Sequence, residues 1–177
     1  MSNLALIMAD EIVNRVEGSG LIQVNLDDFY PEGERVNFDL SEYLKEGLVL
    51  IEKEFRQKLA ETDWLNFKDK YVAINCSSDA IVPLWAYMLV DSYLKSQVKK
   101  SVLGDFQDLE REIFNEVIQH HNFKQYDDKS VIVKGCGKYS IPKSIFVNFT
   151  NKLHLHAKTI MFGEACSAVP VYKKPKK

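Results

Sequence analysis

Val-Ile-Val-Lys-Gly-Cys, residues 131–136, is the stretch from which the fold can be inferred. Its apolar β-branched run indicates a strand, and the glycine and cysteine that end the run are followed by a helix signal near Pro142. The other two cysteines, Cys76 and Cys166, also follow strand patterns and precede prolines. We therefore expect three strands that each lead into a cysteine.

Strand and helix patterns alternate along the chain. The expected central strands are Tyr71–Cys76, Val131–Gly135 and Lys158–Phe162. Leu21–Leu26 and Arg35–Asp39 are expected to pair as an antiparallel edge. Helices are expected at Asp10–Glu17, from Asp39 to about Leu59, from Pro83 to about Gln97, after Gly104 and after Ser140.

This alternation favours an α/β fold. We expect a single layered domain over residues 1–172, with a central, mostly parallel or mixed sheet flanked by helices. Residues 173–177 hold four lysines and are expected to form a basic flexible tail. The sequence indicates no internal repeat of fixed period.

Composition excludes several classes of function. Without the four tail lysines, the chain has 19 basic and 25 acidic side chains, a net charge of −6, which argues against nucleic-acid binding. No apolar run approaches the roughly 18 residues of a membrane span. The N-terminal run Leu4–Met8 is too short for the core of a signal peptide. We expect a cytoplasmic protein, in which three cysteines are thiols or ligands and do not form a disulfide framework.

The three cysteines suggest a site. In a parallel sheet, the carboxyl ends of the strands lie at one edge, so Cys76, Cys136 and Cys166 are expected to lie together there. Three converging thiolates could bind zinc with a fourth ligand, for which Glu164 is a candidate, or an iron–sulfur cluster. A thiol-based sulfur-transfer or redox enzyme and an interaction module with structural cysteines are the alternatives. The sequence leaves the question of an enzymatic reaction open.

Three segments carry a resemblance to a known family: Cys76–Leu89, Val133–Gly137 and Gly163–Lys173, with Glu11–Val16 in support. In these segments the chain resembles the uncharacterised bacterial family called domain of unknown function 2480, over nearly its whole length after Met8. The resemblance implies no activity. Genes of this family often lie beside SUF-type iron–sulfur assembly genes, which implies iron–sulfur assembly proteins as partners.

Overall fold

The computed structural model describes residues 20–135 and 137–175, and these form two compact units. We call them the three-stranded unit (residues 26–122 and 137–151) and the four-stranded unit (residues 20–25, 123–135 and 152–175) after their sheets. The expectation of one domain over residues 1–172 stays a prediction, because compactness alone does not show whether each unit folds independently.

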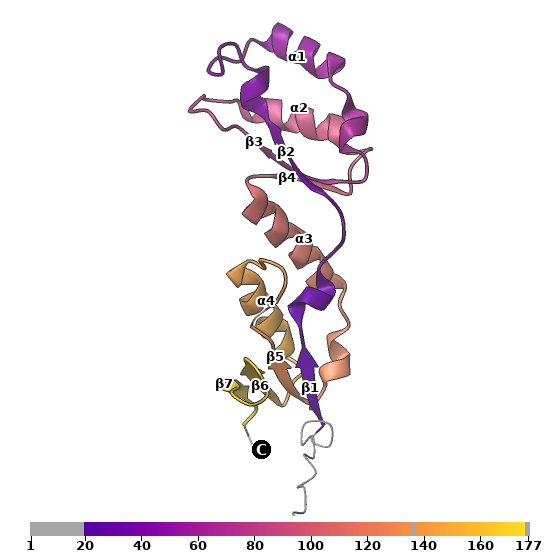
Figure 1. Ribbon diagram of the computed structural model, residues 1–177, viewed down its shortest axis with the longest axis vertical. Helices are drawn as coiled ribbons and strands as arrows, with labels where there is room; N and C mark the ends of the chain where they lie inside the picture. Colours follow the sequence, from indigo (N-terminus) through magenta and orange to yellow (C-terminus); the bar gives the residue numbers. More distant parts are fainter. Residues whose placement is uncertain (1–19, 136, 176–177) are drawn as a thin grey trace, which may run out of the picture. The chain divides into compact units, whose positions relative to one another are not determined.

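The three-stranded unit contains a fully parallel sheet. Its strands are β2 (Arg35–Asp39), β3 (Tyr71–Asn75) and β4 (Lys100–Leu103), in that order across the sheet (Figure 1). Each parallel pair needs a crossover connection. The connections carry the helices α1 (Glu52–Glu61) and α2 (Leu84–Leu94).

Helices cover both faces of this sheet, which makes the unit three layers thick. On one face, Val72 and Ile74 pack in a core cluster with residues of α1 and α2. On the other face, Ala73 packs against Leu109 and Ile113 of helix α3 (Phe106–His120). Because successive residues of a strand point to opposite faces, the three apolar residues at the centre of β3 are buried on both sides of the sheet.

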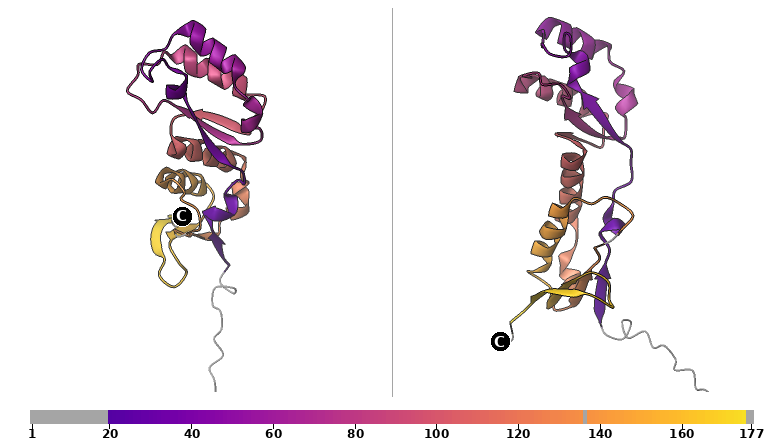
Figure 2. Two further views of the ribbon diagram at one scale, coloured as in Figure 1. Left: turned by 45° about the horizontal axis from the view of Figure 1, so that its top comes forward. Right: turned by 60° about the vertical axis from the view of Figure 1, so that its left-hand side comes forward.

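The four-stranded unit contains a mixed sheet with the order β1-β5-β6-β7. Its strands are β1 (Leu21–Val24), β5 (Ser130–Val133), β6 (Thr159–Phe162) and β7 (Val169–Lys173). The first three run parallel, and β7 is antiparallel to β6 (yellow in Figure 2). The three apolar residues of β5 are at most 2% exposed, so this central strand holds the core of the sheet. The expected α/β class with a mostly parallel or mixed sheet is confirmed.

The expected pairing of the strands needs two corrections. The three strands that precede the cysteines are not neighbours in one sheet, because β3 belongs to the three-stranded sheet while β5 and β6 pair in the other. β1 and β2 do not form an antiparallel edge either. Each is the outer parallel strand of a different sheet, beside β5 and β3 respectively.

A β-α-β segment occurs twice in the chain, so the expectation of no internal repeat is wrong. β3, α2 and β4 correspond to β5, α4 (Lys143–Leu153) and β6, with each residue aligned to the one 59 positions later. Few aligned positions are identical, which hides the repeat in the sequence. Among the identical pairs are Asp69 and Asp128, Val72 and Val131, Pro83 and Pro142, Leu94 and Leu153, and Gly104 and Gly163.

The two copies share their backbone hydrogen bonds as well as their helices and strands. The paired bonds are Lys99 N to Lys70 O and Lys158 N to Lys129 O, both 2.8 Å, and Gly104 N to Ile74 O and Gly163 N to Val133 O, both 3.0 Å. These bonds fix the same turns before and after the parallel strands. The repeat is therefore one of detailed conformation, not only of element order.

The helix expected from Asp39 to about Leu59 is much shorter. Glu46 and Gly47 have φ values of 52° and 71°, in the left-handed region that a right-handed helix cannot include. α1 consequently begins only at Glu52, and Leu48, expected on the buried stripe, is 58% exposed.

The expected tail begins later than the sequence indicates. Lys173, expected to be the first residue of the basic tail, is the last residue of β7. The ring of Tyr172 lies against that of His154, with centroids 3.8 Å apart, and the Lys174 amide donates to the Lys158 carbonyl at 2.9 Å. Backbone pairing therefore anchors the basic segment as far as Lys174.

Some expectations fall outside the described residues. These are the helix Asp10–Glu17, the position of Cys136 and the last two lysines. Among the helices that the structure describes, none combines the length and the apolar character needed to cross a bilayer.

Candidate functional site

Cys76 follows β3 in the three-stranded unit. It is a half-buried free thiol, and its Sγ lies 3.3 Å from the Ser78 hydroxyl. Tyr87, on α2, has its pKa raised by burial and then by the charges of Cys76 and Asp39. The thiol therefore stands in a polar corner at the carboxyl edge of the sheet.

Asp39, the last residue of β2, holds the polar loops beside this thiol in place. One of its carboxylate oxygens accepts the amide hydrogens of Ser41 and Ser77, at 2.9 Å and 3.0 Å. Partial burial raises the pKa of Asp39, but the hydrogen bonds from Ser77 and Ser41 outweigh it and lower the pKa to about 2. Asp39 is therefore a fixed anion that holds two loops together, and it is a poor general base.

Cys166 lies in the turn between β6 and β7 of the four-stranded unit. The thiol is free and exposed. The turn is closed by the Ser167 amide, which donates to the Glu164 carbonyl at 2.9 Å. Gly163 opens the turn with φ 115°, a conformation that favours glycine.

Two contacts join the loops that follow β5 and β6. Lys134 Nζ lies 3.5 Å from a carboxylate oxygen of Glu164. Gly135 stands so close to the ring of Phe162 that an added Cβ would be 2.3 Å from its Cζ. Gly135 directly precedes Cys136, and Glu164 stands two positions before Cys166. Cys136 itself lies outside the described residues.

The repeat shows that the cysteines are not equivalent positions. Cys76 aligns with Gly135, and Cys136 aligns with Ser77, one residue further on. The strand-then-cysteine pattern thus arises differently in each copy. Convergence of all three sulfurs stays a prediction, since Cys76 and Cys166 belong to different units. Within residues 20–135 and 137–175, no group of three or more acidic, histidine or cysteine side chains is arranged to hold a metal ion.

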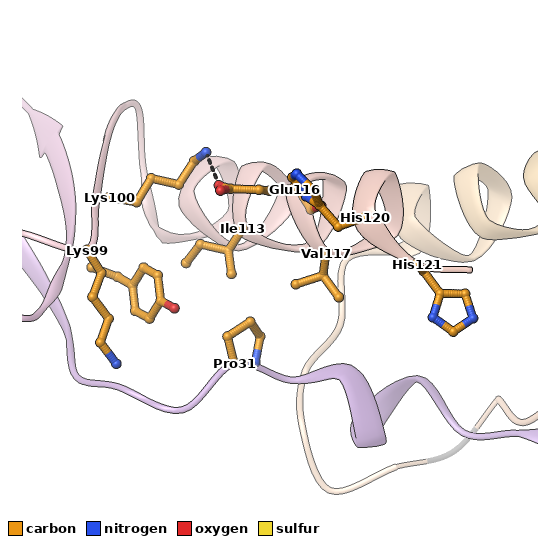
Figure 3. A pocket seen from close by; sticks show the side chains of 9 residues that line it. Pro31, Lys99, Lys100, Ile113, Glu116, Val117, His120 and His121 are labelled. Atoms are coloured by element: carbon orange, nitrogen blue, oxygen red, sulfur yellow. Dashed lines mark hydrogen bonds and ion pairs between the residues drawn. The ribbon is translucent and has the colours of Figure 1, made fainter. Parts of the chain in front are cut away.

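A cavity of about 490 Å³ lies in the three-stranded unit, and nothing in the sequence pattern indicated it. Figure 3 shows its lining: Pro31, Tyr71, Lys99, Lys100, Ile113, Glu116, Val117, His120 and His121. Both of its lysines have partners within the protein. Lys100 pairs with Glu116 at 2.7 Å, and Lys99 Nζ donates to the Glu32 carbonyl at 2.8 Å. Burial lowers the pKa of His121, which favours its neutral form.

A second cavity of about 680 Å³, here called the Lys143 cavity, also belongs to the three-stranded unit. It is lined by Tyr30, Phe106, Gln107, Glu110, Arg111, Ser140, Ile141, Pro142, Lys143 and Ser144. Sequence reasoning missed it because its walls come from segments more than a hundred residues apart. The only signal was the pair of helix starts, after Gly104 and after Ser140.

These features define an α/β protein with a repeated β-α-β segment and free thiols after its strands. The chain belongs to the family described as protein of unknown function (DUF2480), whose model matches residues 10–174. The family predicted from the cysteine segments is thus confirmed. Neither the comparison with curated proteins nor that with solved structures found a match.

Proposed function

We propose that this protein binds a metal ion or an iron–sulfur cluster through its thiols and serves as an accessory to iron–sulfur assembly. The contact between Lys134 and Glu164 carries the proposal, because each residue stands two positions before a cysteine. It supports the approach of the loops that carry Cys136 and Cys166. The proposal that iron–sulfur assembly proteins are its partners rests on the family resemblance alone.

In this proposal the four-stranded unit supplies the first two ligands. Thiolates of Cys136 and Cys166 bind the metal, and Glu164 can exchange its ion pair with Lys134 for a metal bond. Cys76 is the further ligand if the units bring it to the same point.

A thiol redox or sulfur-transfer role is the second candidate. One observation favours it: only two of the three cysteines follow neighbouring strands, and two is the number that a reversible disulfide needs. In that case Cys136 and Cys166 would form a disulfide by passing two electrons to a disulfide acceptor and releasing two protons. Without metal and without reactive thiols, the protein is instead an interaction module with structural cysteines.

Anaerobic preparation of the full chain tests the first role. Iron, zinc and acid-labile sulfide are measured per chain, together with the visible spectrum. Binding of metal that is lost in both Cys136→Ser and Cys166→Ser, and retained in the neighbouring control Ser167→Ala, supports the proposal. Cys76→Ser separates a three-thiol site from a two-thiol site. Metal content that is the same in all variants contradicts the proposal.

The same variants separate the redox candidate. After oxidation by glutathione disulfide, mass spectrometry of the digested protein should detect a Cys136–Cys166 disulfide that dithiothreitol reverses. If the protein binds no metal and forms no such disulfide, the remaining interpretation is an interaction module with structural cysteines.

A further inference from the structure

The Lys143 cavity is walled by three segments of the three-stranded unit. These are the start of α3, the start of α4 with the loop before it, and Tyr30 from the connection before β2. α3 follows the carboxyl end of β4 through Gly104. In α/β folds, ligands bind outside the carboxyl ends of the strands, so the cavity has the usual position of a ligand site.

The cavity has an excess of positive charge. Its cations are Arg111 and Lys143, and its one carboxylate, Glu110, is bound to Arg35 at 2.8 Å and accepts the Tyr30 hydroxyl at 3.1 Å. Arg111 pairs with Asp108 but keeps further N–H groups. Lys143 makes no ion pair or hydrogen bond with any residue that the structure describes.

Three neutral polar side chains of the lining are also without a hydrogen bond in the described part of the chain: Gln107, Ser140 and Ser144. Together with Lys143 they provide donors from both helix starts. Such donors, grouped around one cavity, suit the several acceptor oxygens of a phosphate group.

Aromatic rings form the rest of the wall. The ring of Tyr30 is stacked on that of Tyr139, with centroids 3.8 Å apart and planes at 3°. The Arg35 guanidinium lies over the same ring, 4.2 Å from its centroid, so both faces of the Tyr30 ring are covered within the protein and its edge is what lines the cavity. Phe106 is 48% exposed at the cavity and offers its apolar ring to a ligand. A planar group can therefore be bound beside the cations.

We propose that the Lys143 cavity binds a small phosphate monoester of a planar, aromatic group. Lys143 and Arg111 bind the phosphate oxygens, Gln107 and Ser144 donate to the same oxygens, and the planar group lies against Phe106 and the edge of the Tyr30 ring. The volume of about 680 Å³ is within the range of small-molecule sites. No cysteine is among the residues that line this cavity, so the proposal stands or falls independently of the proposed function.

Phenyl phosphate is the probe, titrated into the full chain and followed by NMR. We expect saturable shifts of the Ile141 methyl groups and of the Gln107 side-chain amide. Lys143→Gln should weaken binding about tenfold or more, because one charge-assisted hydrogen bond is lost. Lys143→Arg should retain binding. Lys152→Gln, which removes an exposed lysine from the same helix, should bind as the wild type does.

The opposite results overturn the proposal. They are shifts that do not saturate by about 10 mM, which corresponds to binding weaker than about 3 kcal/mol, and equal affinity of Lys143→Gln and the wild type. Inorganic phosphate and phenol are titrated separately. Each should bind more weakly than phenyl phosphate, and equal binding of inorganic phosphate would overturn the aromatic part of the assignment.

Discussion

Asp69 and Asp128 stand at the same position in the two copies of the β-α-β segment, and both have left-handed backbones, with φ values of 57° and 54°. In each copy this residue lies in the turn before the central strand. The Asp69 amide donates to the Gln97 carbonyl at 2.9 Å, and the Asp128 amide donates to the His156 carbonyl at 3.0 Å. Aspartate tolerates this conformation better than most residues do.

A β-branched residue at Asp69 should therefore destabilise the protein. Asp69→Val should lower the free energy of unfolding by about 1–2 kcal/mol, because the left-handed region is costly for a branched side chain. Asp69→Gly should be neutral or slightly stabilising. Urea denaturation measures both. The control Lys68→Val changes an equally exposed neighbour with φ −56° and should have little effect. Equal losses at Asp69 and Lys68 would contradict the backbone explanation.

Gly135→Ala should destabilise the four-stranded unit by about 1–3 kcal/mol, because its Cβ would overlap the Phe162 ring. Phe162→Ala in the same chain should remove much of that overlap. The double mutant should therefore be more stable than the sum of the two single effects implies, as measured by thermal unfolding. Strict additivity would show that Gly135 and Phe162 are not in contact.

Asp39 should make stability depend on acid pH. Its folded pKa of about 2 lies below the ordinary value of 3.8, so its contribution is complete above about pH 4 and is lost as the pH falls towards 2. Asp39→Asn should cost about 1 kcal/mol at pH 7 through weakened hydrogen bonds. The mutant should also lose less stability than the wild type between pH 4 and pH 2. Parallel curves for the two proteins would assign the acid sensitivity to other groups.

Truncation tests the anchoring of the basic segment. Removal of residues 173–177 deletes the backbone pairing of Lys173 and Lys174 with β6 and the residue before it. We expect a loss of about 1 kcal/mol, which lowers the Tm by about 2–4 °C for a chain of this size. Removal of residues 175–177 alone is the control and should leave the Tm unchanged. Two identical Tm values would mean that this pairing adds no stability.

The sequence predicted most elements but not how they combine. Runs of apolar residues placed β3, β5 and β6, and an alternating pattern placed β1, each within a residue or two. The signal is strongest for β3 and β5, because a strand buried on both faces is apolar at successive positions. β4 was missed since its four residues begin with lysine and serine. Without β4, the chain between β3 and β5 looked like one long crossover, and a single sheet was the natural inference.

For the candidate site, too, the local patterns were predicted and their arrangement in space was not. Sequence reasoning found the cysteines and the family, because both are local patterns. It placed β3 beside β5 and β6 because strand order in a sheet is set by contacts distant in sequence, which no local pattern reports. The Lys143 cavity could not be predicted for the same reason, because Tyr30 and Lys143 line one cavity only in the folded chain.

The order of the strands also governs when each sheet can form during synthesis. The partners of β2 follow within the next segments of the chain, so the parallel pairing of β2, β3 and β4 is complete once Leu103 has left the ribosome. Leu21 of β1 must wait for Ser130, and all three strands of the three-stranded sheet are made in between. Contacts so distant in sequence form slowly. A nascent chain therefore exposes the unpaired edge of β1 for most of its translation, and this strand is where premature association with other chains would begin.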